Sequence, residues 1–465
     1  MSLALKSGDR VPVVTVATGT TLGAQVQSQV SSTGREDRED PFYLVDLGRL
    51  VELHQLWSAA LPGVHPFYAV KCNNDPVLMQ TLAALGCGFD CASKAEIKSV
   101  LDLGVSSKVR LQKGVATMTF DNEVELYKVK THYPTARLVL RIRADDPSAL
   151  CQLGVKFGCT VDEGKKLLLR ARDMELCVVG ISNEASPYLI SMSAATPRTR
   201  RCSRRLSRCL TNSSSSESHS VSVSTSSDIG GGFPGTRDSE GFFTHLTDVL
   251  KEGLGRYFSG RPELKIIAEP GRFFACSTHT LAVNIISKRE VSVTTPNQET
   301  TPTFMYFVND GVYGSFNCIL YDHITPTPFV VKSPPAGATV HASSLWGPTC
   351  DGLDKICDSS LPLLQVGDWL YFPDMGAYTV SAASNFNGFT KPMTYYAVSE
   401  DLRQRFLTVW NSELDSGAHF RLPPPPPLHR DNVDDDDPQL PLATTDRPGC
   451  CDNLAAPPQE LVPVF

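Results

Sequence analysis

From residue 41 to residue 276, short apolar runs alternate with longer segments whose apolar residues recur every three or four positions. Short runs bounded by glycine or polar residues predict β-strands, and the longer spacing predicts helices that cover a sheet. Repetition of the two predicts a parallel α/β fold, and the number of units matches a (β/α)8 TIM-like barrel. The predicted strands are 42–47, 67–71, 89–92, 118–120, 137–143, 176–181, 229 and 265–269, and the predicted helices are 49–60, 75–85 and 94–103.

Beyond this barrel the pattern changes to strands separated by turn residues, without alternating helices. This predicts a mainly-β C-terminal domain at 277–420. In the N-terminal segment, 1–40, we predict an edge strand at 13–16 that pairs with the β domain. A proline run and an aspartate run predict a disordered tail at 421–465. The strands predicted in the β domain are 280–288, 303–308, 369–372 and 393–399.

One internal segment, 183–227, has a composition foreign to its position. It is rich in serine and arginine, although it lies between two predicted barrel strands, where a loop and a helix are expected. Its clustered arginines leave no apolar stripe wide enough to cover a sheet. We therefore expect that this segment does not form the barrel element. Either it is a disordered surface insertion or it is a gene-model artefact.

Composition and charge favour a two-domain globular protein over a nucleic-acid-binding, membrane-spanning or secreted one. A chain of 465 residues with 41% hydrophobic residues predicts two domains with sizeable cores. The net charge of −7 gives no reason to expect binding to nucleic acid or to an anionic membrane. No apolar run is long enough to span a bilayer, and the N-terminus lacks a secretory pattern. The 14 cysteines include no paired Cys-x-x-Cys zinc pattern, so we expect reduced thiols in the cytoplasm and no metal.

Four segments carry the candidate chemistry. Pro-Phe-Tyr-Ala-Val-Lys-Cys-Asn at 66–73 ends a predicted strand at a lysine, and a glycine-rich turn occupies 230–235. Ala-Glu-Pro-Gly-Arg follows at 268–272, and Trp-Gly-Pro-Thr-Cys-Asp-Gly at 346–352. Each segment alone has an ordinary explanation, such as a solvated strand end or a loop. The turn also satisfies the dinucleotide pattern G-x-G-x-x-G, but Pro234 interrupts it.

Together and in this order, the four segments resemble the eukaryotic ornithine decarboxylase family of pyridoxal-phosphate enzymes. The resemblance covers about 41–180 and 228–410, including Phe-Val-Asn-Asp-Gly-Val-Tyr-Gly-Ser-Phe-Asn at 307–317. It implies an alanine-racemase-like barrel with a β domain and the cofactor pyridoxal 5'-phosphate. It also implies decarboxylation of L-ornithine to putrescine, the first step of polyamine biosynthesis. The family forms homodimers whose sites are shared across the interface, and some of its members bind antizyme.

The same resemblance assigns roles to single residues. Lys71 corresponds to the lysine that forms an imine with the cofactor aldehyde. Glu269 corresponds to the carboxylate at the ring nitrogen, and Arg272 to the phosphate-binding arginine. Cys350 corresponds to the cysteine that protonates the α-carbon from the other subunit. Further cofactor-binding positions are Asp90, Arg141, Gly230, Gly231, Gly232, Pro270, Gly271 and Tyr378; substrate-binding positions are Tyr321, Asp322 and Asp351; Lys156 and Phe386 match family positions with less certain roles.

The chain departs from the family pattern in two places. No His-x-Gly-Ser loop follows the strand that ends near 182, and 109–117 is shorter than the family's strand, loop and helix. The second region belongs to the surface that binds antizyme in the family. Two alternatives to ornithine decarboxylase therefore stay open: a catalytically impaired, antizyme-binding protein like the antizyme inhibitors, and a decarboxylase of lysine or an arginine-derived substrate. The retained Cys-Asp-Gly at 350–352 favours an enzyme.

Overall fold

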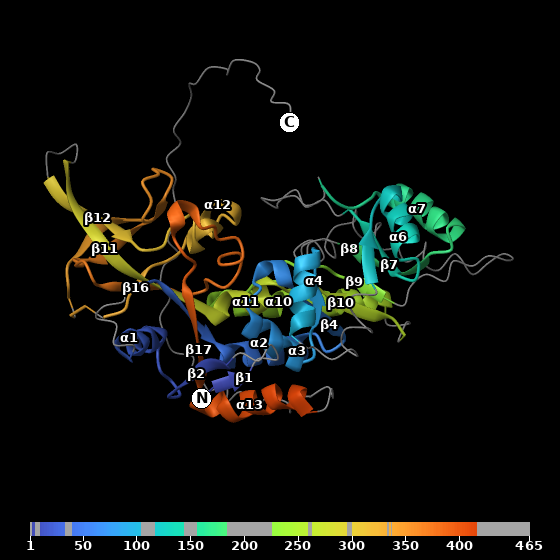
Figure 1. Ribbon diagram of the computed structural model, residues 1–465, viewed down its shortest axis with the longest axis horizontal. Helices are drawn as coiled ribbons and strands as arrows, with labels where there is room; N and C mark the ends of the chain where they lie inside the picture. The colour runs from blue at the N-terminus through green and yellow to red at the C-terminus, as the bar shows by residue number, and fades with distance from the viewer. Residues whose placement is uncertain are drawn as a thin grey trace, which may run out of the picture. The chain divides into compact units, whose positions relative to one another are not determined.

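Two β-sheets organise the chain in the computed structural model (Figure 1). One has seven strands, all parallel, and the other has ten strands of mixed direction. The anomalous segment at 183–227, the short region at 109–117 and the tail at 421–465 lie almost entirely outside the described residues. The structure describes residues 2–4, 10–32, 40–103, 117–143, 156–183, 226–258, 263–294, 300–332, 334–335 and 337–415.

The parallel sheet has the cyclic strand order of a barrel. Its order in space is β5-β4-β10-β9-β8-β7-β6, so the strands follow chain order and the last pairs with the first. Among the described strands the ring is open between β5 and β6, and residues 104–116 in that connection lie outside the described chain. The strands are β4 (Val64–Ala69), β5 (Gly88–Asp90), β6 (Thr117–Phe120), β7 (Arg137–Ile142), β8 (Cys177–Asn183), β9 (Ser226–Asp228) and β10 (Lys265–Ala268).

Helices connect these strands, and side-chain caps start several of them. Asp46, Asp75 and Ser93 each accept a hydrogen bond from a backbone N–H in the first helical turn. Thr160 and Glu163 form a reciprocal capping box. The three helices predicted from the sequence are confirmed to within two residues. The helices are α2 (Leu47–Ala60), α3 (Pro76–Ala84), α4 (Lys94–Asp102), α6 (Glu123–His132), α7 (Val161–Asp173), α10 (Glu240–Phe258) and α11 (Arg272–Ala275).

The second sheet runs in the order β1-β2-β17-β3-β11-β12-β14-β15, with β16 pairing to β11 and β13. The strands predicted at 369–372 and 393–399 are confirmed at both ends. Four strands, β1 and β13 to β15, and three helices, one of them the short α12 (Cys318–Tyr321), were not predicted. The strands are β1 (Ser2–Ala4), β2 (Arg10–Val16), β3 (Phe42–Asp46), β11 (His279–Thr294), β12 (Thr300–Val308), β13 (Phe329–Val330), β14 (Val340–Trp346), β15 (Lys355–Pro362), β16 (Trp369–Phe372) and β17 (Met393–Ser399); the helices are α1 (Leu22–Ser32) and α13 (Glu400–Asp415).

Several predicted strands differ in their place or their ends. β3 pairs with β11 and β17 in the second sheet, although its pattern groups it with the strand–helix repeats. Its side chains are buried on both faces, so its sequence reads like a barrel strand. β2 is not an edge strand, because β1 pairs outside it. β9 ends at Asp228, one residue before Ile229.

An aromatic core fixes the segments that flank the candidate site. The Trp57 ring lies 4.7 Å from the Phe233 ring and 5.3 Å from the Phe273 ring, between ring centroids. Phe233 follows the glycine turn and Phe273 follows Arg272, so one core holds both segments. The Trp57 indole N–H donates to the Val64 carbonyl at 3.0 Å, which satisfies its buried polar group.

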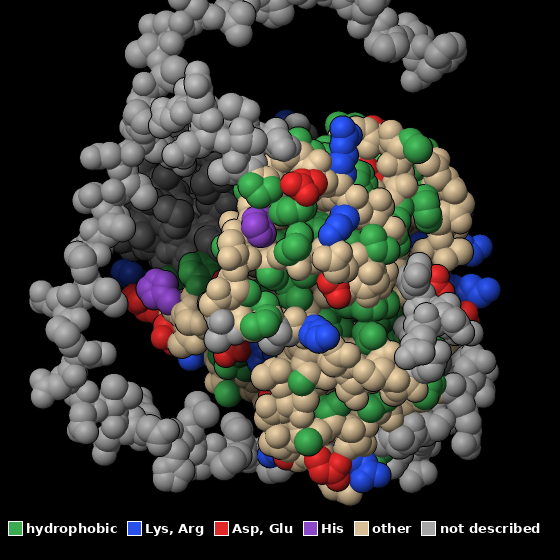
Figure 2. Space-filling view, turned by 90° about the vertical axis from the view of Figure 1, so that its left-hand side faces the viewer, with side chains coloured by type: hydrophobic (Ala, Val, Ile, Leu, Met, Phe, Trp, Pro, Cys, Tyr) green, Lys and Arg blue, Asp and Glu red, His purple; other side chains and the backbone are tan. Residues whose placement is uncertain are grey.

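The described helices include no candidate membrane span. No described helix is both long enough and apolar enough to cross a bilayer. Figure 2 views the molecule from the side of β11, β12 and α1. There, hydrophobic side chains are interspersed with polar ones, and acidic and basic side chains are scattered. That face therefore carries no large block of one charge.

Candidate active site

Lys71 lies in the short turn Val70–Cys72 that directly follows β4, not in the strand itself. Its Nζ atom is 3.8 Å from Oδ2 of Asp90, and 51% of its side chain is exposed. Asp90 is the last residue of β5, which pairs in parallel with β4, so both groups meet at the carboxyl edge of the sheet. The lysine amine is thus accessible and has a carboxylate beside it.

Two further carboxyl groups meet at the same edge. Asp228 ends β9, and Glu269 directly follows the neighbouring β10. The two side chains are hydrogen-bonded to each other. Burial raises the pKa of Glu269 well above its ordinary value, and the negative charges of Asp228 and Asp90 raise it further. Burial also raises the pKa of Asp228, but the donors Gly230 and Ser182 oppose that shift, so Glu269 is the member of the pair that favours the protonated form.

Arg141 supplies positive charge to these carboxylates. It lies near the end of β7 and interacts electrostatically with Glu269, Asp90 and Asp228. Burial lowers the pKa of its guanidinium, and the neighbouring carboxylates oppose that shift. Its guanidinium carbon also lies 4.4 Å from the centroid of the Phe157 ring, which the Lys156 ammonium approaches at 5.1 Å.

The glycine turn packs directly on the segment that carries Glu269 and Arg272. Gly230 and Gly232 have φ values of 75° and 88°, in the left-handed region that favours glycine. A Cβ atom on Gly231 would lie 2.7 Å from the Glu269 carbonyl oxygen, and one on Gly235 would lie 2.2 Å from that of Arg272. Only glycine permits this approach, so the turn brings its backbone next to both functional residues.

Arg272 is the first residue of α11 and has two polar neighbours from the β domain. Its guanidinium forms an ion pair with Asp322 and lies 5.3 Å from the centroid of the Tyr378 ring. Tyr378 has a φ of 55°, a costly conformation for a tyrosine. Its N–H donates to the Cys72 carbonyl at 2.9 Å, which ties it to the Lys71 turn. Tyr321, beside Asp322, is 68% exposed.

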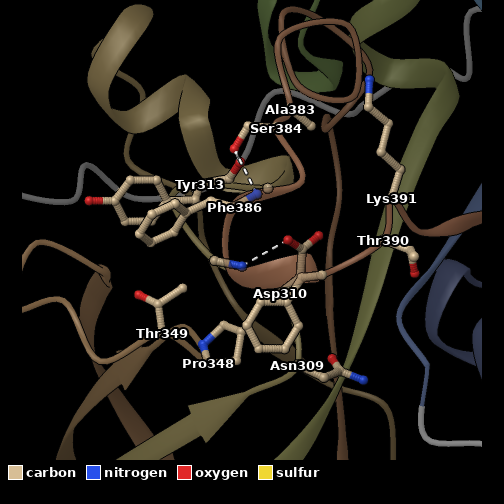
Figure 3. Close-up of a pocket in the computed structure, with 13 residues that line it drawn as sticks. Asn309, Asp310, Tyr313, Pro348, Thr349, Ala383, Ser384, Phe386, Thr390 and Lys391 are labelled. Atoms are coloured by element: carbon tan, nitrogen blue, oxygen red, sulfur yellow. Dashed lines mark hydrogen bonds between the residues drawn. The ribbon is translucent and has the colours of Figure 1, made fainter.

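Cys350 and Asp351 form a separate group in the connection between β14 and β15. Cys350 is exposed, and Asp351 accepts a hydrogen bond from the Tyr313 hydroxyl. The Tyr313 ring stacks on Phe386 with centroids 4.4 Å apart, and both residues line a small hollow (Figure 3). Across the described residues, no hydrogen bond or ion pair joins this group to Lys71, Glu269 or Arg272.

Sequence reasoning missed Asp228 and Ser182 as members of the site. Ser182 Oγ donates to Asp228 at 3.0 Å, and both side chains are buried next to Glu269. Asp228 was detectable in principle, because it is an acidic residue two positions before the glycine turn at a strand end. Ser182 carries no such local signal, since its role depends on the pairing of β8 with β9.

The residues present fit pyridoxal 5'-phosphate. An accessible amine suits the aldehyde, and a buried carboxyl group suits the ring nitrogen. The guanidinium of Arg272 and the glycine turn suit the phosphate, since such turns aim backbone N–H groups at anions. In the described part of the chain, no cluster of His, Cys, Asp or Glu has the arrangement of a metal site.

Comparisons with known proteins agree with a site for pyridoxal 5'-phosphate. The family "Pyridoxal-dependent decarboxylase, pyridoxal binding domain" matches residues 47–276. "Ornithine decarboxylase" of Mus musculus is 43% identical over 400 residues, 82% of this chain and 85% of the mouse protein. "Antizyme inhibitor 2" of Xenopus laevis is 43% identical over 393 residues, 80% of this chain and 84% of that protein.

A solved structure extends the similarity to the whole fold. The arginine decarboxylase of Paramecium bursaria Chlorella virus, bound to agmatine, superposes with a TM-score of 0.70 at 32% identity. The match covers 81% of this chain and 100% of the viral protein. The barrel and β-domain architecture expected from the sequence is thereby confirmed. The chain belongs to the eukaryotic-type ornithine decarboxylase family of pyridoxal-phosphate-dependent enzymes.

Proposed function

We propose that this protein is a carboxy-lyase that converts L-ornithine to putrescine and CO2 with pyridoxal 5'-phosphate, the first step of polyamine biosynthesis. One observation carries the proposal. The Lys71–Asp90 pair and the Glu269–Asp228 pair lie at the same edge of the parallel sheet. At one edge of the sheet, an amine can bond to the cofactor's aldehyde, and a protonated carboxyl group can bond to its ring nitrogen. The identity to several ornithine decarboxylases supports the choice of substrate.

Each residue of the chain has a defined task in this proposal. When bound, the cofactor supplies an electron sink for the charge left by departing CO2. Lys71 bonds to its aldehyde, and Asp90 orients the lysine amine. Glu269 faces the ring nitrogen, where its proton stabilises the sink. Arg272, Tyr378 and the glycine turn hold the phosphate. Arg141 offsets the negative charge of the three carboxyl groups.

The proton that completes the reaction comes, in this proposal, from Cys350 of the partner subunit in a homodimer. Cys350 is exposed and lies in the separate group that also holds Asp351. Phe386 and Phe389 line the hollow beside that group, and each is 44% exposed. Such a surface is typical of an interface between subunits. Asp322, Tyr321 and the partner subunit's Asp351 then take up the distal ammonium of the substrate.

A direct assay tests the reaction. The purified full chain with added pyridoxal 5'-phosphate is incubated with carboxyl-labelled ornithine, lysine or arginine, and released CO2 and the amine product are measured. We expect putrescine from ornithine at the highest kcat/KM, and Lys71→Ala should lose the activity. Release from lysine or arginine at a higher kcat/KM would transfer the function to the related decarboxylases. No release from any substrate would contradict the enzyme.

A second candidate function is binding to antizyme. The similarity to "Antizyme inhibitor 2" equals that to the mouse ornithine decarboxylase, at 43% identity. Immobilised antizyme is exposed to the full chain, and binding is compared with the CO2 assay above. Binding without decarboxylation would establish the inhibitor-like function, whereas decarboxylation with or without binding would establish the enzyme.

We also propose that the protein works in the cytoplasm. Cys72, Cys91 and Cys276 are thiols without a disulfide in the structure, as expected in a reducing compartment. A fluorescent fusion and cell fractionation test this location. Recovery in a secreted or membrane fraction would contradict it.

A further inference from the structure

The Asp228 side chain is buried and has hydrogen-bond donors to both of its carboxyl oxygens. Its side chain is 3% exposed, and each carboxyl oxygen has its own donor. Ser182 Oγ donates to Oδ2 at 3.0 Å, and the Gly230 N–H donates to Oδ1 at 2.9 Å. Two donors stabilise the ionised form of this buried group. Burial raises the pKa of Asp228, and these two donors act against that shift while they fix the orientation of the carboxyl group.

The backbone fixes Glu269 relative to this anion. The Glu269 N–H donates to the Gly230 carbonyl at 2.8 Å, while the N–H of Gly230 donates to Asp228. Gly230 thus binds both partners of the carboxyl pair. Glu269 directly follows β10, which pairs with β9, so its place next to Asp228 is set by strand register. The hydrogen bond between the two side chains follows from this arrangement.

The surrounding charges decide which partner carries the proton. Asp228, Asp90 and Lys71 face Glu269, and Arg141 faces all three carboxyl groups. Of the two paired groups, Asp228 has the hydrogen-bond donors from Ser182 and Gly230. Burial and two neighbouring negative charges raise the pKa of Glu269. Burial raises the pKa of Asp228 as well, but its two donors lower it again, so the pair favours the proton on Glu269.

We propose that Asp228 is a positioning residue that keeps a proton on Glu269 and presents Glu269 to the cofactor's ring nitrogen as a hydrogen-bond donor. On cofactor binding, the O–H bond of Glu269 breaks and an N–H bond forms at the ring nitrogen, while Asp228 remains ionised. No other reactant is needed, because the transferred proton is already in the site. This inference rests on the proposed position of Glu269 at the ring nitrogen.

Infrared spectroscopy of the cofactor-free full chain tests the stored proton. Glutamate labelled with ¹³C at its side-chain carboxyl shifts the carbonyl band of protonated Glu269 away from those of aspartic acids. We expect this band at neutral pH in the wild type and its loss in Glu269→Gln. It should also be lost in Asp228→Asn, because the asparagine amide donates to Glu269 and removes the neighbouring charge. A wild type without the band would overturn the proposal, whether or not the variant folds.

Calorimetry in buffers of different ionisation enthalpy tests the transfer. We expect Asp228→Asn to take up about one proton more than the wild type on binding pyridoxal 5'-phosphate, since its Glu269 has none to give. Ser182→Ala removes one of the two donors to Asp228 but keeps both carboxyl groups and the Gly230 donor, so its proton uptake should lie between those of the wild type and Asp228→Asn. With an analogue that has CH in place of the ring nitrogen, the difference between wild type and Asp228→Asn should vanish. Equal proton uptake by wild type and Asp228→Asn with the natural cofactor would overturn the proposal.

One further variant tests separately whether Glu269 faces the ring nitrogen. Glu269→Gln should weaken binding of pyridoxal 5'-phosphate more than binding of the CH analogue. If both ligands lose affinity equally, Glu269 does not face the ring nitrogen, and the proposed function of that residue is wrong. If only the natural cofactor is affected but proton uptake does not depend on Asp228, then the position is right and the inference about Asp228 is wrong.

Discussion

The side-chain amide nitrogen of Asn73 lies 3.1 Å from Nε2 of His279, a residue 206 positions later in the chain. The same nitrogen donates to the Gly376 carbonyl at 2.9 Å, and Oδ1 of Asn73 accepts from the Asp75 N–H. An amide nitrogen only donates, so His279 accepts at Nε2 and carries its proton on Nδ1. Asn73 lies two residues after Lys71, and these bonds anchor the lysine turn to the β domain.

Replacing Asn73 should destabilise the protein. Asn73→Ala leaves His279 Nε2 and the Gly376 carbonyl buried without this donor, so the free energy of unfolding should fall by about 2–4 kcal/mol. The neighbouring Asn74 is exposed, and Asn74→Ala should cost less than about 0.5 kcal/mol. Urea unfolding of both variants measures the difference. Equal midpoints for the two would show that the Asn73 bonds are not stabilising.

His279 should make stability fall in mild acid. Burial lowers the pKa of its imidazole to about 4, whereas an unfolded histidine titrates near its ordinary value of 6.5. Below pH 6.5 the unfolded chain takes up a proton that the folded chain refuses, so stability is lost as pH falls toward 4. Between pH 7 and pH 5 this amounts to about 2 kcal/mol. Chemical unfolding at both pH values should show that loss reduced in His279→Gln; an unchanged loss would contradict the assignment.

Asp310 should act in the opposite direction over the same range. Burial raises the pKa of its carboxyl to about 6 from the ordinary 3.8, and its Oδ1 accepts from the Gly311 and Ser315 N–H groups. The folded chain therefore binds a proton first, so stability is gained as pH falls through 6. The gain from pH 7 to pH 5 is about 1 kcal/mol. Asp310→Asn should abolish it, so the variant should lose more stability on acidification than the wild type. A smaller loss than the wild type would refute this.

Lys71 should be the single attachment point of the cofactor. It combines an accessible amine with a place at the sheet edge next to Asp90. Borohydride reduction of the loaded protein, followed by peptide mapping, should find pyridoxyl label on the peptide that contains Lys71. Lys156 is the matched control, because its ammonium approaches the same Phe157 ring as Arg141, and it should carry no label. Label on Lys156, or on any other lysine, would overturn the assignment.

Subunits should complement each other if sites are shared. Cys350→Ala should bind cofactor normally but slow putrescine formation by a factor of about 10² or more. A mixture of Lys71→Ala and Cys350→Ala chains should recover part of the wild-type activity, because one hybrid site keeps both groups. Light scattering and a tagged-chain exchange assay confirm that mixed dimers form. Mixed dimers without recovered activity would show that each site is completed within one chain.

Local sequence patterns predicted most of the described strands but only three of the described helices, and the elements with mixed surfaces were missed. The strands at 369–372 and 393–399 are rich in β-branched, aromatic and other apolar residues and were found at both ends. β14 and β15 contain pairs of serines, and burial alternates irregularly along each strand. Neither sequence therefore shows the regular apolar alternation that predicts a strand. α1 buries only Val26 and Gln29 of its helix, which is too few for a recognisable apolar stripe.

The sequence by itself determined the residue types at the strand ends. Lys71, the glycine turn and Glu269 could be identified because their local contexts span only a few positions. Only the tertiary structure decided that β3 joins the second sheet, that Asp228 bonds to Glu269, and that Asp351 accepts from Tyr313. These relationships depend on strand register and on burial of polar groups between distant segments. Neither is encoded in the spacing of neighbouring residues, because both arise only when the sheets assemble.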